Sequence, residues 1–192
     1  MSSATNFNAF PVAEILERFK PRASTIEASK EKTTSVELLD HLVNDGDFYA
    51  AIDFVAHAMP PQALVWWGCL CIWDFERNQS TPQFEHAMSL VIAWLQTPEE
   101  KQRRALESID DKQFAASHPL RLLAKAAFMS HGSIVPAGLA AVKAPEFMFA
   151  VIGAGAIKLV AANSPAAEFS ANSKQILRLA MEVVQGSNRW VK

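Results

Sequence analysis

Residues 151–157 form a glycine-containing run, Val-Ile-Gly-Ala-Gly-Ala-Ile, whose spacing resembles a nucleotide-binding turn. In a dinucleotide-binding fold, such glycines follow an apolar strand and let the backbone approach the pyrophosphate. Here Lys158 stands where the third glycine is required, and no acidic residue follows about twenty positions later to bind the ribose. We therefore interpret the run as part of a helix whose small residues let a neighbouring helix approach closely, namely Ala150, Gly153, Ala154 and Ala156.

The cysteines and histidines form no recognisable catalytic or metal-binding motif. Cys69 and Cys71 are two positions apart, so on a helix they point in different directions and are poorly placed for a disulfide. The histidines occur singly, at positions 41, 57, 86, 118 and 131, and no Gly-x-Ser-x-Gly sequence is present. The sequence therefore predicts buried free thiols and no catalytic residue, cofactor or metal ligand. An enzyme whose site is assembled from distant segments remains the alternative.

Composition and charge argue against several classes of partner. The chain has 192 residues, a net charge of −2 and a pI near 6.2, so it offers no basic surface for nucleic acid or an anionic membrane. Residues 1–10 are polar and lack the apolar segment of a signal peptide. The apolar stretch 64–75 is too short to cross a bilayer, and 147–162 is interrupted by Lys158. We expect a bacterial cytoplasmic protein without a membrane span.

Prolines and hydroxyl residues mark the starts of helices along most of the chain. Thr81-Pro82, Thr97-Pro98 and Ser164-Pro165 each place a hydroxyl at an N-cap and proline at the first helical position. Thr34 with Glu37, and Thr97 with Glu100, have the spacing of a capping box. The predicted helices are 12–19, 35–43, 48–58, 61–76, 82–96, 98–109, 119–130, 145–162 and 165–185.

These helices predict an all-α fold, a compact orthogonal bundle of about eight helices, and their short connections also allow a solenoid-like stacking. Residues 21–33 are polar and lack an apolar stripe, so 1–33 are predicted to be a flexible N-terminal arm and linker. Residues 34–192 then form a single helical domain. Gly132 and Gly186 are placed as C-terminal helix caps.

The predicted helix 61–76 is apolar on every side, which places it at the centre of the fold. We expect Trp66 and Trp73 to be buried, with Phe84 and Trp94 of the next helix against them. The same aromatic cluster could instead enclose a ligand pocket. By contrast, 98–109 reads as a surface helix with a solvated charged face, on which Glu99 pairs with Arg103 and Glu100 with Arg104.

Residues 132–144 form a long and unusually apolar loop. Helix–helix connections usually have about two to eight residues, and longer loops are often functional. This loop carries Ile134, Val135, Leu139 and Val142, which solvent alone would not favour. Either these side chains seal the helical core or they offer an apolar surface to another protein. We predict that at least part of the loop docks, with these four residues as the partner-binding set.

The run at 60–71, Pro-Pro-Gln-Ala-Leu-Val-Trp-Trp-Gly-Cys-Leu-Cys, resembles an uncharacterised family of bacterial helical proteins associated with type VI secretion gene clusters. Ala93-Trp94, Arg103-Arg104 and Ser130-His131-Gly132-Ser133 also look similar, and the resemblance spans roughly 48–162. It implies a non-enzymatic adaptor or chaperone that binds a protein partner, an effector or a spike component of the secretion system. The alternative is an all-α enzyme or small-ligand-binding protein that uses the aromatic core as a pocket.

Overall fold

The computed structural model describes residues 10–32, 34–110, 112–136 and 138–186. Within these ranges the all-α class is confirmed, with ten α-helices rather than about eight and no strand beyond one isolated bridge. None of these helices is long and apolar enough to span a bilayer. The α-helices are α1 (Val12–Glu17), α2 (Ala23–Glu31), α3 (Ser35–Asn44), α4 (Phe48–Ala58), α5 (Pro61–Glu76), α6 (Pro82–Gln96), α7 (Glu100–Ala105), α8 (Pro119–Phe128), α9 (Met148–Ala162) and α10 (Phe169–Val184).

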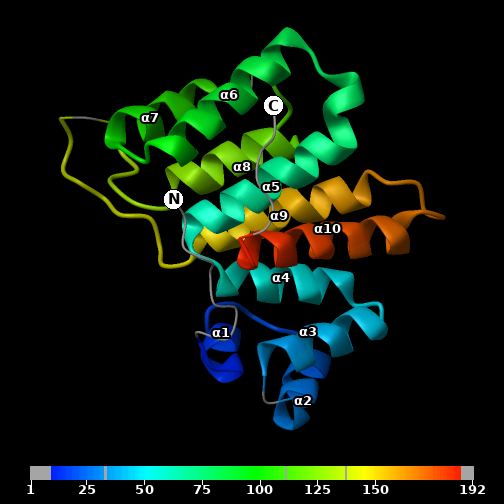
Figure 1. The fold of residues 1–192 in the computed structure, drawn as a ribbon. Helices are drawn as coiled ribbons and strands as arrows, with labels where there is room; N and C mark the ends of the chain where they lie inside the picture. Colours follow the sequence, from blue (N-terminus) through cyan, green and yellow to red (C-terminus); the bar gives the residue numbers. More distant parts are fainter. Residues whose placement is uncertain (1–9, 33, 111, 137, 187–192) are drawn as a thin grey trace.

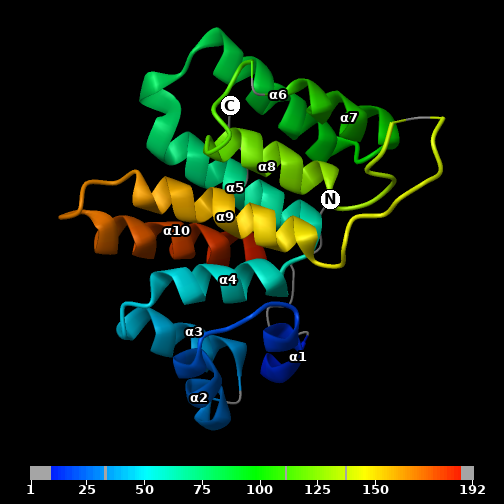
Figure 2. The same cartoon turned by 180° about the vertical axis from the view of Figure 1, so that it is seen from behind.

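Helices α4, α5, α8, α9 and α10 lie side by side and form the body of the molecule (Figure 1 and Figure 2). Helices α6 and α7 lie on one side of this body, and α1, α2 and α3 lie on the other side, beyond α4. Helix α9 contacts not only its sequence neighbours α8 and α10 but also α4 and α5, which lie much earlier in the chain. These contacts between helices that are far apart in the chain differ from solenoid-like stacking, in which each repeat contacts only the repeats next to it in sequence.

Several helix starts follow the predicted capping chemistry. Thr34 and Glu37 form the predicted capping box at the start of α3. The hydroxyl of Thr81 accepts a hydrogen bond from the backbone N–H of Phe84 at the start of α6. Proline occupies the first position of α5, α6 and α8, where its missing N–H removes no helical hydrogen bond.

Three predicted starts are wrong because their prolines lie in turns that precede the helix. Thr97 ends α6, and α7 begins at Glu100, whose carboxylate pairs with arginine side chains instead of capping the helix. Helix α9 begins at Met148 rather than at 145, after Phe147 adopts a left-handed φ of 56°. Helix α10 begins at residue 169 rather than 165, and the hydroxyl of Ser164 accepts from the Asn172 side chain.

The segment predicted as a linker contains helix α2, and α1 buries Val12, Ile15 and Leu16. The Arg18 guanidinium donates to the carbonyl oxygen of His57 at 2.9 Å, and the Phe19 ring stacks on the His57 ring with centroids 4.7 Å apart. Residues 12–17 and 23–31 are therefore helical, and α1 packs on α4 while α2 packs on α3. The parts of the predicted arm at 1–9 and 33 lie outside the described residues.

Helix α5 lies in the core, as predicted, although its most buried tryptophan is Trp67. Its indole N–H donates to the carbonyl oxygen of Ile176 in α10 at 2.8 Å, which satisfies the polar atom of a fully buried ring. Trp66 and Trp73, predicted to be buried, are only partly buried. Cys69 and Cys71 are buried free thiols, and burial raises the pKa of both.

Close approach explains one of the two glycines in α9. A Cβ atom on Gly153 would lie 2.8 Å from a methyl carbon of Leu64 in α5, so the Leu64 side chain would have to shift to admit a side chain at this position. Residues 151–157 are helical throughout, in agreement with the interpretation that they do not form a nucleotide-binding turn. Gly155 has nothing within 4 Å of such a Cβ, and no packing contact requires it.

Candidate partner-binding loop

The four residues predicted to bind a partner divide into two pairs. Leu139 is 65% exposed and Val142 is 47% exposed, whereas Ile134 and Val135 have intermediate burial. The loop that carries them joins α8 to α9 and projects from the helical body (Figure 1 and Figure 2). The exposed pair is therefore accessible to another molecule, and the partly buried pair lies nearer the helices.

Hydrogen bonds close the base of this loop. Ser133 and Lys143 form an antiparallel bridge, and the backbone N–H of Ile134 donates to the carbonyl oxygen of Val142 at 2.8 Å. The Ser133 hydroxyl also accepts from the backbone N–H of Val142 at 3.2 Å. We call residues 133–135 together with 142–143 the loop base. Because the base is closed, the two ends of the projecting segment are held together.

Two consecutive arginines of α7 fix the loop base to the helical body. Arg103 donates to the carbonyl oxygens of Phe128 at 2.8 Å and of Ser133 at 2.9 Å. Arg104 donates to the carbonyl oxygens of Ser133 at 2.7 Å and of Val135 at 2.8 Å. Both guanidinium groups lie over the Phe128 ring, 4.5 and 5.4 Å from its centroid. We call this pair the arginine clamp.

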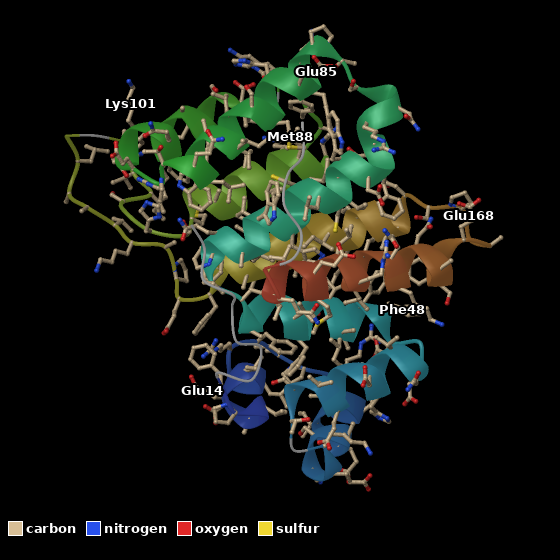
Figure 3. All side chains as sticks on the ribbon, viewed as in Figure 1. Glu14, Phe48, Glu85, Met88, Lys101 and Glu168 are labelled. Carbon is tan, nitrogen blue, oxygen red and sulfur yellow. The ribbon has the colours of Figure 1, made fainter. Side chains whose placement is uncertain are left out.

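The prediction of a solvated surface helix is therefore wrong for Arg103, which is fully buried. By contrast, Lys101 of the same helix points away from the body (Figure 3). The predicted pair of Glu100 with Arg104 is confirmed, whereas Arg103 also pairs with Glu100 and no ion pair joins it to Glu99 among the described residues. Glu100 accepts from Arg103 at 2.6 and 2.7 Å and from Arg104 at 2.8 Å.

Glu100 pairs with both arginines of the clamp from its exposed side. The hydrogen bonds from Arg103 and then Arg104 lower the pKa of the Glu100 carboxyl to about 2, so the carboxylate is ionised at neutral pH. A buried guanidinium is tolerated only when it is paired and its N–H groups find acceptors. Here the acceptors are one carboxylate and two backbone carbonyl groups that belong to Phe128 and Ser133.

Gly132 allows the loop to pass close to the clamp. Its φ of 72° lies in the left-handed region, and a Cβ atom at this position would lie 2.8–2.9 Å from atoms of the Arg103 guanidinium. Both the backbone conformation and the space therefore require glycine. Gly132 was predicted as the cap of the preceding helix, but α8 ends at Phe128 with Met129 as its C-cap. Gly186, with φ of 67° directly after the C-cap of α10, fits its predicted role.

His131 connects the start of the loop to the core. Its ring stacks on Trp94 with centroids 6.2 Å apart, and its Nδ1 lies 2.8 Å from the Ser130 hydroxyl. Burial, followed by the nearby Arg103 charge, lowers the pKa of His131. The ring is therefore neutral at neutral pH, and it adds a second point of attachment beside the clamp.

A cavity of about 760 Å³ lies at the opposite end of α9 from the loop. Its lining includes Phe75 and Phe84 but none of the core tryptophans that were predicted as a possible pocket. Trp67 and Trp94 are instead fully buried by packing. Across the described residues, no group of three or more His, Cys, Asp or Glu side chains is arranged to hold a metal ion.

Comparison with known protein families places the clamp and the loop within a region that matches one family. Residues 38–184 match the family of unknown function DUF6931. The chain belongs to this family. The matched region includes α7, the loop and the cavity, whereas α1 and α2 precede it. No curated protein and no solved structure matches the chain.

The role of the clamp was missed from sequence, although part of its signal is local. Glu100 is followed by arginines at the third and fourth positions, and both spacings place the charges on one helix face. The carbonyl acceptors lie 25–31 positions later in the chain, at Phe128, Ser133 and Val135. No local pattern specifies such acceptors.

Proposed function

We propose that this protein is a non-enzymatic accessory protein that binds a protein partner through the loop 132–144, with Leu139 and Val142 as the principal contacts. The observation that carries the proposal is an apolar surface on a loop whose base is fixed. Leu139 is 65% exposed on a projection that Arg103 and Arg104 hold to the body. A loop that is ordered before binding loses less conformational entropy when a partner docks.

The distribution of burial favours docking over sealing for the exposed pair. A side chain that seals the core loses most of its exposure, as Ile134 and Val135 partly do. Leu139 and Val142 retain about half of their exposure or more. Their apolar surface is therefore available to be removed from water by a partner.

For the partner we propose an effector or spike component of a type VI secretion system, bound in the bacterial cytoplasm before loading. The support for this class is the resemblance of the run at 60–71 to helical proteins associated with such gene clusters. An adaptor or chaperone role also agrees with the apolar character of the exposed Leu139 and Val142. A hydrophobic anchor of this kind fits a complementary apolar groove on the partner.

The test uses purified effector and spike proteins encoded near the gene. Binding to the wild-type protein is compared with binding to Leu139→Ser/Val142→Ser by isothermal titration calorimetry. The matched control is Val151→Ser, because Val151 is 53% exposed but lies on α9 outside the loop. We expect the double variant to lose binding by more than about tenfold while its melting temperature and the control are unchanged. Equal affinity for the wild type and the folded double variant would refute the loop as the docking site.

A further inference from the structure

The cavity at the end of the bundle has the size of a small-molecule site. It is formed where α5 ends, α6 begins and α9 turns into α10, together with the segment that precedes α8. Its volume of about 760 Å³ falls within the usual range of about 300–1,000 Å³ for ligand pockets. Figure 3 shows Glu168 at this end of the molecule, far from the loop that projects on the other side.

The charged lining of the cavity is acidic. Glu76 and Glu168 contribute two carboxylates, and none of the described lining residues is a lysine or an arginine. His118 also lines the cavity, and burial lowers its pKa, so its ring is neutral at neutral pH. Its Nδ1 accepts a hydrogen bond from the backbone N–H of Leu120. A cation that enters therefore meets negative charge that no lining cation balances.

Aromatic rings form the apolar part of the lining. Phe75, Phe84 and Phe114 contribute rings, and the Phe114 ring lies 4.5 Å from the His118 ring. The faces of aromatic rings attract cations, and ammonium groups are often held by rings together with a carboxylate. An apolar ligand body would also be removed from water against the same rings.

Glu76 is the lining residue whose carboxyl group is affected by burial and not by a neighbouring charged group. It is partly buried at the end of α5, and burial alone raises the pKa of its carboxyl, with no contribution from a hydrogen bond or a nearby charge. A partly desolvated carboxylate without a counter-ion is unfavourable, and a bound cation relieves this cost. The side chain is thus placed to recognise positive charge.

We propose that this cavity binds a small organic cation, an ammonium group attached to an apolar body, with Glu76 as its counter-ion. Glu168 adds negative charge at the rim, and the phenylalanine rings take the apolar body. The inference is independent of partner binding by the loop, because the two sites lie at opposite ends of α9.

The test uses three amines as probes: phenethylamine, choline and cadaverine. 2-Phenylethanol and phenylacetate serve as neutral and anionic analogues of the first probe. Binding to the full chain is followed by ¹H–¹⁵N NMR, which also locates the site through the amides of Glu76, Ser117 and Asn163. We expect at least one amine to shift these signals in a saturable way, the two analogues to bind at least tenfold more weakly, and the amides of the loop to stay unchanged.

Glu76→Gln should weaken amine binding by about tenfold or more, because a charge-assisted contact is replaced by a neutral one. The matched control is Glu85→Gln, which removes the same charge from an exposed position near the start of α6 that does not line the cavity. Absence of saturable binding by all three amines would overturn the proposal, as would equal binding of the alcohol. If Glu76→Gln does not fold, the comparison of amine with alcohol on the wild-type protein still decides the matter.

Discussion

Replacement of Arg103 by methionine tests whether the clamp fixes the loop. Methionine keeps much of the side-chain volume but removes the guanidinium, so the carbonyl oxygens of Phe128 and Ser133 lose a donor. A buried polar group left without its partner costs about 1–3 kcal/mol. Ser133 keeps its second donor from Arg104, which reduces its share. We therefore expect the free energy of unfolding to fall by about 2–4 kcal/mol.

Two measurements check this expectation, with Arg104→Met as the matched control. Urea denaturation gives the free energy of unfolding, and the control should lose less because its side chain is 23% exposed and water can replace its contacts. Hydrogen exchange at the Ile134 amide, which donates to Val142, reports on the loop base. Exchange there should accelerate in Arg103→Met. Equal stability of the two variants, or unchanged exchange at Ile134, would show that the buried arginine does not hold the loop.

Three further outcomes follow from packing and protonation. Trp67→Ala should lower the free energy of unfolding by about 3–5 kcal/mol in urea denaturation, and Trp73→Ala by clearly less because that ring is only partly buried. Burial lowers the pKa of His57, so as the pH falls the unfolded chain binds a proton on this ring before the folded chain does. The free energy of unfolding should therefore fall as the pH drops below about 6.5, and His57→Phe should make it depend less on pH. Gly132→Ala should lower the melting temperature, whereas Gly155→Ala should raise it because its Cβ lies in open space within a helix. A higher melting temperature for Gly132→Ala than for Gly155→Ala would contradict the steric argument.

The helices that sequence predicted best are those that begin with a local hydrogen bond. Thr34 and Thr81 each satisfy the N–H group three residues later, so a short pattern contains both partners. Ser164-Pro165 has the same pattern, but its hydroxyl accepts from a side chain on the next helix. Proline fits a turn as well as a first helical position, and only the tertiary contact distinguishes the two. The pattern is therefore informative where its partner is local.

The missed features depend on contacts between distant segments. Helix α2 has little apolar surface and buries Thr25 alone, so periodicity could not distinguish it from a polar linker. Arg103 is buried because the carbonyl groups of Phe128 and Ser133, which follow 25 and 30 positions later, turn toward it. Charge in a sequence is normally a sign of exposure. The cavity was missed for the same reason, because its lining combines the ends of α5 and α9 with the segment before α8.

The chemistry of the clamp bears on what the loop does. Two arginines and a glutamate are a costly way to gain stability, because a buried guanidinium must be desolvated and apolar side chains of similar volume often stabilise equally well. Their hydrogen bonds to Phe128, Ser133 and Val135 give something that apolar packing does not, a single backbone conformation at the loop base. If the loop only covered the core, that conformation would matter little, and all of its large apolar side chains would face inward. Leu139 instead faces solvent beyond a fixed base, which is the arrangement expected of a preorganised binding surface.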